Sequence, residues 1–365
     1  MFMSTSSRKL EHMQLCAQQQ VESRKAGPGF KDVKLVHRAL PEMDMDSMDI
    51  STSFLGKKLD APFMIASITG GHPDTTPVNA ALAEAAEETG IGIGVGSQRA
   101  AIEDTVQEES FSVVRDKAPN AFVYGNIGAA QVKEYGIEGA EKLVEMLDAD
   151  ALAVHLNFLQ EAIQPEGDRD ATGCIGAIEE ICSIDVPIIV KETGAGISRE
   201  DALLLKEAGV AAIDVGGAGG TSWAGVEVYR AKQRGDRISG HLGELFWDFG
   251  IPTIPSLIEC RVSLPLIATG GVRTGLDIAK SLAIGANLAS AALPFVAPAL
   301  KEGDSVKQRL ELMFEELKVA MFLCGCPDIE SLRTSSSVVF QGETLEYLDQ
   351  RGFDIRDIEL RSKLL

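Results

Sequence analysis

The sequence is poor in aromatic residues and in positive charge. Of its 365 residues, 5% are aromatic, and 54 Asp and Glu outnumber 34 Lys and Arg, which gives a formal net charge of −20. Binding to nucleic acid depends on clustered Lys and Arg that displace counterions from phosphates. The acidic balance therefore argues against nucleic acid as a partner. A phosphorylated small molecule stays compatible with it, because a few local donors decide such binding.

Cysteine is also scarce, and long apolar runs are absent. The six cysteines form no CxxC pair, and their spacing suits no zinc site, so we expect free thiols in a reducing compartment. The longest apolar runs fall short of the ~18 residues that mark a bilayer-spanning helix, which predicts no membrane insertion. The first residues, MFMSTSSRKLEHM, do not resemble a signal peptide. We therefore expect a cytoplasmic protein.

What the sequence does contain is a repeated pair of a short apolar strand and a helix. Strands are predicted at 62–67, 90–97, 121–126, 151–157, 187–193, 211–217, 265–271 and 286–292. Near-continuous apolar strands are typical of a parallel sheet covered on both faces. Eight such units favour a closed (β/α)8 TIM barrel. A doubly wound open sheet is the alternative, and the lack of GxGxxG after the first strand counts against it.

Further segments flank or interrupt the predicted barrel domain, 62–300. Residues 1–61 are expected to form an N-terminal arm, with a helix and a hairpin that covers the bottom of the barrel. Residues 301–365 are expected to form a C-terminal helical extension. An insertion at 218–250 is rich in Gly, Trp and charge. Because long insertions on a compact domain are commonly functional, we expect a mobile lid there.

A group of polar residues follows the fourth predicted strand. The run ADALAVHLNFLQE places His155, Asn157, Gln160 and Glu161 within seven residues. Because alternate side chains of a strand share a face, His155 and Asn157 point to the same side as the small alanines before them. An ordinary buried strand with a polar exit loop is the simpler interpretation. Four such groups together favour a ligand site.

The other strand ends are also polar or rich in glycine, and the active site of a TIM barrel is built from these ends. They carry Ser67, Thr69, Ser97, Gln98, Arg99, Asn126, Lys191 and Thr193. After the seventh strand, TGGVRTG runs directly into a helix, where glycines let backbone N–H groups approach a phosphate. Arg273 could add a charge-assisted bond. The alternative is that the glycine pair only makes a tight turn.

Two charged residues suggest what the site binds. Lys191 ends the apolar strand PIIVKE, where it is either a Schiff-base amine or a partner for an electron-rich ring. Asn126 and the hydroxyl residues of the first two strands favour the ring, which predicts FMN with its phosphate near the last two strands. Glu161 is a hard oxygen ligand, and one carboxylate plus substrate phosphates commonly holds Mg²⁺. A solvated loop carboxylate is the alternative.

Taken together, these features resemble the type 2 isopentenyl-diphosphate delta-isomerase family along nearly the whole chain. The residues that carry the resemblance are RKLEHM (8–13), ALPEMDMDSMDISTSFLGKKLDAP (39–62), ITGGH (68–72), GVGSQR (94–99), NIGA (126–129), HLNFLQE (155–161), VKETGAGIS (190–198), GAGGTSWAGVE (217–227) and ATGGVRTG (268–275). The resemblance implies an FMN-dependent (β/α)8 enzyme of isoprenoid biosynthesis. It would interconvert isopentenyl and dimethylallyl diphosphate without net redox change.

The resemblance also implies partners and residue roles. It implies reduced FMN, NAD(P)H as the reductant, Mg²⁺ held by Glu161, and a homo-tetramer or homo-octamer. Substrate contacts would come from Arg8, Lys9, Ser97, Gln98, Arg99, His155, Asn157 and Gln160, with Gln160 beside the reacting carbons. FMN contacts would come from Ser67, Ile68, Thr69, Ser97, Asn126, Lys191, Thr221, Gly271, Val272, Arg273, Ala292 and Leu293. With no obvious pair of carboxylic acids near the ring, the flavin itself is expected to supply acid and base.

Two other functions are compatible with an FMN barrel. A 2-hydroxy-acid oxidase or dehydrogenase needs a histidine base and an arginine for the carboxylate, and none of the five histidines has an obvious arginine partner late in the barrel. A flavin-binding protein without catalysis is the other alternative. The polar residues after the fourth strand argue against it.

Overall fold

The computed structural model describes residues 5–301, 303–335 and 337–354. Within these residues, eight parallel strands close into a barrel in the order β10-β11-β4-β5-β6-β7-β8-β9. The strands are β4 (Phe63–Ile65), β5 (Gly92–Gly94), β6 (Phe122–Gly128), β7 (Ala151–Leu156), β8 (Ile188–Glu192), β9 (Ala212–Asp214), β10 (Leu266–Thr269) and β11 (Leu288–Ala291). Each overlaps a predicted strand, so the TIM barrel is confirmed and the open sheet is excluded.

Along each strand, the side chains point alternately into the barrel and outward toward the surrounding helices. In β7, Ala151 and Ala153 pack inside the barrel with Met64, Phe122 and other interior side chains. The large residues between them pack outward in the main core, against the surrounding helices. The small inward residues leave space along the axis, and the same face carries His155 toward the barrel mouth. The predicted division of this strand into two faces is therefore confirmed.

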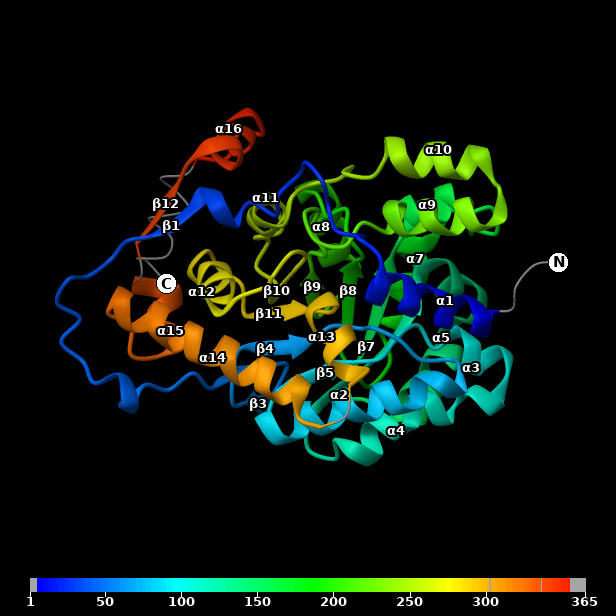
Figure 1. The fold of residues 1–365 in the computed structure, drawn as a ribbon, viewed down its shortest axis with the longest axis horizontal. Coiled ribbons are helices and arrows are strands. Elements are labelled where there is room, and N and C mark those ends of the chain that lie inside the picture. The colour runs from blue at the N-terminus through cyan, green and yellow to red at the C-terminus, as the bar shows by residue number, and fades with distance from the viewer. Residues whose placement is uncertain (1–4, 302, 336, 355–365) are drawn as a thin grey trace.

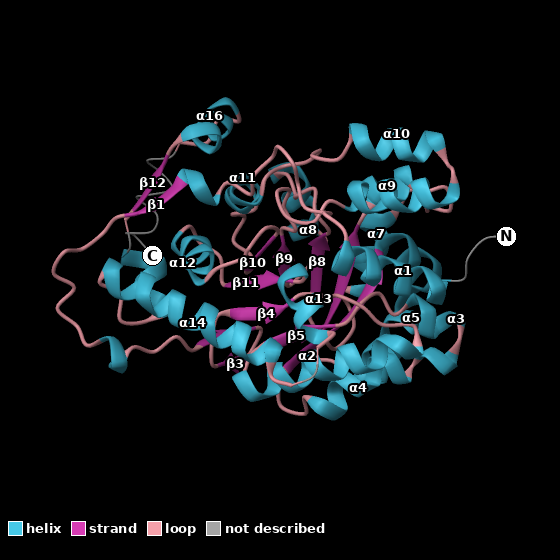
Figure 2. Cartoon of the chain, in the orientation of Figure 1, coloured by secondary structure: helices cyan, strands magenta, loops and turns pink. Residues whose placement is uncertain are grey.

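Helices surround the barrel strands on the outside (Figure 2). They include α2 (Thr76–Thr89), α3 (Arg99–Glu103), α4 (Glu109–Lys117), α5 (Ala129–Leu147), α7 (Cys174–Ile181), α8 (Arg199–Glu207), α11 (Thr253–Glu259), α12 (Gly275–Ala283) and α14 (Ser305–Cys324). Helix α14 packs on both α12 and α2. It therefore lies where a TIM barrel has the helix that follows its last strand, here β11. The predicted extension therefore begins with a barrel helix, delayed in sequence by the short α13 (Leu293–Ala299).

The bottom of the barrel is covered by a hairpin of the arm. Strands β2 (Thr52–Phe54) and β3 (Lys57–Leu59) pair antiparallel. The ring of Phe54 lies 5.8 Å from that of Phe122, centroid to centroid, in an edge-to-face contact. Phe54 and Leu59 join the interior cluster of the barrel. The hairpin therefore closes the end opposite the strand exits, as the sequence predicts.

The start of the arm and the insertion at 218–250 lie together near the barrel mouth. The arm contributes α1 (Thr5–Gln18), and the insertion folds into α9 (Trp223–Arg234) and α10 (Arg237–Leu245). Ser222 N donates to Val21 O at 2.8 Å, and Trp247 Nε1 donates to Glu22 O at 3.0 Å. In Figure 1, α1 lies beyond the carboxyl ends of the strands, beside α9. The insertion is therefore a helix pair bonded to the arm, and its mobility as a lid stays a prediction.

The described C-terminal residues return to the arm. After α15 (Ile329–Ser335), strand β12 (Val338–Phe340) pairs antiparallel with β1 (Val33–Leu35) of the arm, and α16 (Gly342–Gln350) follows. The Asp32 carboxylate accepts from Thr344 N at 3.1 Å and from Thr344 Oγ1 at 2.9 Å. The remaining elements are α6 (Phe158–Ile163), η1 (Phe30–Asp32), η2 (Met45–Ser47), η3 (Pro73–Thr75) and η4 (Thr105–Gln107).

Two expectations about the whole chain can be compared with the described residues. None of the helices in this part is both long enough and apolar enough to cross a membrane. All six cysteines fall within it, and all six are free thiols. Cys324 ends α14, followed by Gly325 in the left-handed region at φ 71°, a common helix termination.

Candidate active site

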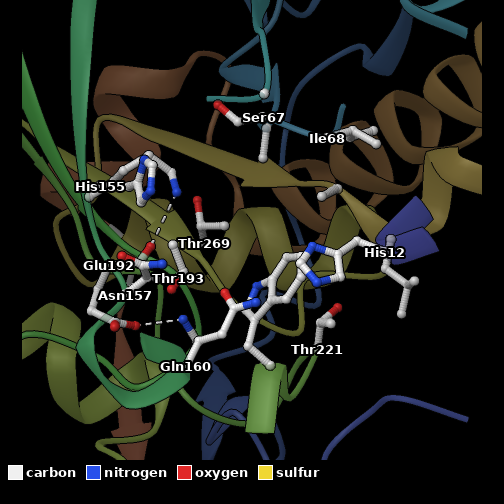
Figure 3. A pocket seen from close by; sticks show the side chains of 18 of the residues that line it. His12, Ser67, Ile68, His155, Asn157, Gln160, Glu192, Thr193, Thr221 and Thr269 are labelled. Atoms are coloured by element: carbon white, nitrogen blue, oxygen red, sulfur yellow. Dashed lines mark hydrogen bonds between the residues drawn. The ribbon is translucent and has the colours of Figure 1, made fainter. Parts of the chain in front are cut away.

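An open cavity of about 210 Å³ lies at the carboxyl ends of the barrel strands. TIM barrels place their sites there. Figure 3 shows His155, Asn157 and Gln160 on one side of it, with Ser67 and Ile68 facing them from another. His12 enters from α1 near Thr221. Residues of the barrel and of the arm therefore face one another across this cavity.

Most of the predicted site residues line this cavity. They are Lys9, Ser67, Ile68, Ser97, Arg99, Asn126, His155, Asn157, Gln160, Glu161, Lys191, Thr221, Gly271, Arg273, Ala292 and Leu293. The backbone of Arg8 belongs to α1, and its side chain lies outside the described residues. The side chains of Thr69, Gln98 and Val272 are not part of the lining.

The structure places Gln98 in the core instead of the substrate site. Its side chain is fully buried; Nε2 donates to Leu143 O at 3.0 Å and Oε1 accepts from Asn126 N at 2.9 Å. Neighbouring residues of the turn after β5 point in different directions, so Ser97 and Arg99 reach the cavity and Gln98 does not. Its role is to fix the backbone of Asn126.

Thr69 and Val272 are likewise buried, at 1% and 0% exposure. The carbonyl of Thr69 accepts from Gly96 N at 2.8 Å and from Asn79 Nδ2 at 3.2 Å, which joins the first two strand-end loops. Val272 packs in the main core. Neither residue is part of the cavity lining.

Glu161 lies in the first turn of α6, held by neutral donors. Oε1 accepts from Asn157 Nδ2 at 2.7 Å, and Oε2 accepts from Gln164 Nε2 at 2.5 Å and Asp168 N at 2.8 Å. The described residues contain no cluster of three or more His, Cys, Asp or Glu able to hold a metal. A cation at Glu161 would thus depend on phosphate oxygens and water, which is the common arrangement for Mg²⁺. The donor set fits that ion.

Gln160 is oriented by a residue that the sequence reasoning missed. Its Nε2 donates to Glu227 Oε1 at 2.9 Å, and the two side chains are 7% and 2% exposed. His12 Nε2 lies 3.5 Å from the same oxygen, and the His12 ring meets Trp223 edge-on. Burial raises the pKa of Glu227, but His12 and Arg230 outweigh it and hold that pKa below its ordinary value. Glu227 is therefore a carboxylate, which keeps the amide NH₂ of Gln160 turned toward it.

Arg99 is held in place by two carboxylates. Its Nε donates to Glu103 at 2.7 Å and its Nη1 to Asp168 at 3.0 Å. Gln131 Nε2 donates to the same Asp168 oxygen at 2.7 Å. Burial lowers the pKa of Arg99, but Glu103 and Asp168 outweigh it and raise that pKa. A guanidinium carries five N–H donors, so donors are left for an anion in the cavity.

His155 is a neutral imidazole at the end of β7. Its Nδ1 lies 2.9 Å from Asn126 Oδ1, whose amide orientation is set by donation from Nδ2 to Val95 O at 3.1 Å. Nδ1 is therefore the donor, which leaves Nε2 as an acceptor. Burial is the main reason that the pKa of His155 lies well below its ordinary value, and the positive charges of Lys191 and Lys9 add to it.

A buried ammonium and two carboxylates lie at the ends of β8 and β9. Burial lowers the pKa of Lys191, although Asp214 and Glu192 act against it. Burial also raises the pKa of Asp214 to about 6 and that of Glu192 to about 7. Glu192 accepts from the backbone N–H groups of Gly194 and Ala195. A lysine in such surroundings suits the electron-rich edge of a planar ring.

The glycine pair after β10, Gly270 and Gly271, lines one side of the cavity. Gly271 has φ +72°, and a Cβ there would lie 2.8 Å from Pro28 Cβ and 2.9 Å from Gly219 O. The loops come this close only because glycine has no side chain. Arg273 lies beside them, with Nη2 2.6 Å from Glu22 Oε1. Backbone groups and one paired guanidinium form a cradle that fits the phosphate of FMN.

Several cavity residues were not predicted as site residues, namely His12, Met13, Cys16, Gln131, Gln164, Glu192 and Trp223. The sequence does contain a pattern that indicates the buried charges behind these residues. In WAGVEVYRAKQR, Glu227 and Arg230 stand at i and i+3 among buried Ala and Val of α9. Such a pair on an apolar helix face indicates a buried ion pair with a specific role.

Comparison with known proteins agrees with this geometry. The family described as FMN-dependent dehydrogenase matches residues 4–151 and 157–339. An isopentenyl-diphosphate delta-isomerase of Methanococcoides burtonii is 72% identical over 362 residues, covering 99% of this chain and 100% of the relative. The protein of the same name from Archaeoglobus fulgidus is 56% identical, covering 96% of this chain and 100% of the relative.

Solved structures show the same fold at low identity. A flavocytochrome b2 variant superposes with a TM-score of 0.65 at 18% identity, covering 94% of this chain and 88% of that one. A mandelate oxidase with (S)-2-phenylpropionate gives 0.62 at 20% identity, covering 90% and 94%. These likenesses concern the barrel, whereas the curated relatives match at high identity over nearly the whole chain. The chain therefore belongs to the type 2 isopentenyl-diphosphate delta-isomerase family, within the FMN-dependent dehydrogenases.

Proposed function

We propose that the protein interconverts isopentenyl diphosphate and dimethylallyl diphosphate by proton transfer in isoprenoid biosynthesis, with reduced FMN and Mg²⁺. The observation that carries the proposal is one cavity with two unlike walls. One wall has Lys191 and the glycine pair, which suit a flavin. The other wall has Lys9, Arg99 and Glu161, which suit a diphosphate with its metal. Relatives at 72% and 70% identity carry the name of this isomerase.

FMN would be held mainly by strand ends. Its phosphate would lie against the loops around Gly271 and Arg273 and the start of α13 at Ala292 and Leu293. Its ring would contact Ser67, Ile68, Ser97, Asn126, Lys191 and Thr221. When bound and reduced by NAD(P)H, the flavin supplies an acid and base beside the alkene. The positive charge of Lys191 favours an electron-rich ring in this place.

The diphosphate would lie against the opposite wall. Lys9 and Arg99 line it with His155 and Asn157, and Arg8 precedes Lys9 in α1. An anion beside His155 would raise the pKa of this imidazole, because it opposes the effect of the two lysines. Glu161 would hold Mg²⁺, which would offset the negative charge of the diphosphate.

The reaction moves one double bond. The terminal methylene carbon gains a proton, and the carbon next to the oxygen-bearing one loses a proton, so there is no net redox change. Alkene carbons are weak bases, so the acid must lie close to the carbon in a site shielded from water. Gln160 is too weak an acid to protonate an alkene. With its NH₂ held by Glu227, it would orient the carbon chain or relay a proton.

The test is turnover under anaerobic conditions with FMN, Mg²⁺, a reductant and isopentenyl diphosphate. We expect the allylic isomer, with deuterium at the reacting carbons when the reaction runs in D₂O. Absence of the isomer would contradict the proposal. Reduction of bound FMN by a 2-hydroxy acid would instead support the oxidase alternative. That alternative is disfavoured because His155 neighbours Asn126, Lys191 and Lys9, whereas the oxidase needs an arginine there.

We also propose a homo-tetramer or homo-octamer, and NAD(P)H as the source of the flavin electrons. Light scattering after gel filtration measures the first, and a monomer at micromolar concentration would contradict it. Anaerobic bleaching of the flavin absorbance by NADH or NADPH measures the second. Failure of both nucleotides to bleach it would exclude them as reductants.

A further inference from the structure

Arg230 is buried at the centre of an ionic network that joins three separate segments. Its exposure is 1%, although it is one of the longest charged side chains. Nη1 lies 2.6 Å from Glu227 Oε2 in α9, and Nη2 lies 2.6 Å from Glu166 Oε1, in the loop after α6. Nε lies 3.0 Å from Glu11 Oε2 in α1. Each nitrogen of the guanidinium thus faces a carboxylate from a different segment.

Each of these three carboxylates is connected to residues of the cavity by a different contact or element. Glu227 uses its other oxygen, Oε1, to accept from Gln160 Nε2 at 2.9 Å. Glu11 lies in the same helix as Lys9 and His12, which line the cavity. Glu166 follows Gln164, whose Nε2 donates to Glu161 at 2.5 Å. A shift of the guanidinium would therefore be transmitted to the groups assigned to the carbon chain, the diphosphate and the metal.

Stability alone is a weak reason for such a network. Desolvation of buried ions offsets much of their attraction, and well-packed apolar residues often replace them without loss. A planar guanidinium fixes the directions of its partners, which an apolar side chain or an ammonium cannot do. The network therefore provides a fixed geometry. The rigid guanidinium of Arg230 sets the positions of Glu11 in the arm and of Glu227, which bonds Gln160.

We infer that Arg230 is a positioning residue that couples the docking of α1 to the orientation of Gln160. The inference rests on the proposed function. When α1 lies over the mouth, Glu11 completes the partners of Arg230, and the guanidinium holds Glu227 where it directs the Gln160 amide. When α1 moves away, Arg230 loses one of its anchors and the orientation of Glu227 relaxes. Closure of the arm on a substrate and alignment of Gln160 are thereby one event.

The test is Arg230→Lys in the full-length, flavin-loaded enzyme. Lysine keeps the charge but cannot bond three carboxylates in one plane. We expect kcat to fall about 10²-fold, the scale of a small misplacement of a group at the reacting atoms. FMN affinity should stay unchanged, because the partners of Arg230 lie on the substrate side. Hydrogen–deuterium exchange of the α1 amides should increase.

Arg351→Lys is the matched control. Arg351 also bonds two carboxylates, with Nη2 3.0 Å from Glu259 Oε2 and 2.7 Å from Glu200 Oε2, and neither carboxylate is in the cavity lining. We expect kcat and α1 exchange to remain at the wild-type level. An equal fall of kcat in both variants would indicate general destabilisation and overturn the inference.

The remaining outcomes separate this inference from the proposed function. If the wild-type enzyme isomerises its substrate and Arg230→Lys keeps both its kcat and its α1 exchange, the inference is wrong. If the wild-type enzyme gives no isomer, the proposed function is wrong instead. Should Arg230→Lys fail to fold, Glu11→Gln removes the charge by which the arm pairs with Arg230 and, at 3.4 Å, with Arg234. It should raise α1 exchange and lower kcat in the same direction, and an unchanged kcat would overturn the coupling.

Discussion

The two proposed walls of the cavity, the flavin wall with Lys191 and Gly271 and the substrate wall with Arg99 and Glu161, differ in what fixes their polar groups. On the flavin wall, Lys191 and Gly271 stand at the ends of strands whose backbone ladders already set their places. Behind the substrate wall, Glu11 and Glu227 come from helices far apart in sequence, and both form ion pairs with Arg230. The first wall is preformed by the barrel. The second is assembled from segments that can separate, so alignment there depends on closure.

The largest effect is expected on the substrate wall, at the group nearest the reacting carbons. Gln160→Leu keeps the bulk of the side chain and removes its amide, so kcat should fall about 10²–10⁴-fold, the range for loss of a positioned proton-transfer group. Anaerobic isomerisation measures the rate, and flavin fluorescence measures FMN binding. FMN binding should be unaffected if the two walls are separate; a parallel loss of it would break the comparison.

Next in size is a pH effect on the flavin wall. The pKa of Glu192, raised from 4.5 to about 7 by burial, means that the folded protein holds this proton more tightly than the unfolded chain. Stability from this group is therefore present below pH 4.5 and lost as pH rises to about 7. The shift corresponds to about 3 kcal/mol.

Glu192→Gln should remove that dependence, because the amide stays neutral. Urea unfolding of the flavin-free protein at pH 5 and pH 8 measures it. The free energy of unfolding of the wild type should fall relative to that of Glu192→Gln between the two pH values. If the difference in unfolding free energy between the two proteins is the same at pH 5 and pH 8, burial does not raise the pKa of Glu192.

A smaller effect is expected at the metal. Glu161→Gln keeps the shape of the side chain and its acceptor oxygen but removes the charge, so the Mg²⁺ concentration for half-maximal activity should rise about 10–100-fold. FMN binding should not change. Glu84→Gln serves as the control, because Glu84 pairs with Lys117 at the surface. An unchanged Mg²⁺ titration of Glu161→Gln would remove this residue as a ligand.

The smallest effect tests the preformed wall. Gly271→Ala and Gly235→Ala both place a side chain at positive φ, +72° and +69°, but only the first would meet neighbouring atoms. Both should lose about 1 kcal/mol from the backbone conformation. Gly271→Ala should in addition weaken FMN binding about tenfold, or about 1.4 kcal/mol, while the Mg²⁺ titration stays as in the wild type. Equal FMN affinity in the two variants would contradict the cradle.

The sequence predicts the residues at the strand ends better than the charged residues that support them from the insertion, for a physical reason. Strand ends of a parallel barrel converge, so the positions of Lys191 and Asn126 follow from counting strands. Gln98 was misplaced because adjacent residues of a turn point to different sides. Glu227 and Arg230 reach the site from an insertion whose packing depends on the arm. No local pattern shows which distant carboxylate an arginine will bond.

The pairing of β1 with β12 has a consequence for the newborn chain. Residues 33–35 emerge early, but their partners at 338–340 emerge last, about 15–60 s later at translation rates of roughly 5–20 residues per second. Until then the ladder that ties the arm to the carboxyl-terminal residues cannot form. The contacts of the arm with the insertion and with the barrel bottom use residues made earlier, so the pairing of β1 with β12 is a late addition to them. A translation product that ends before residue 338 would lack this strand pairing.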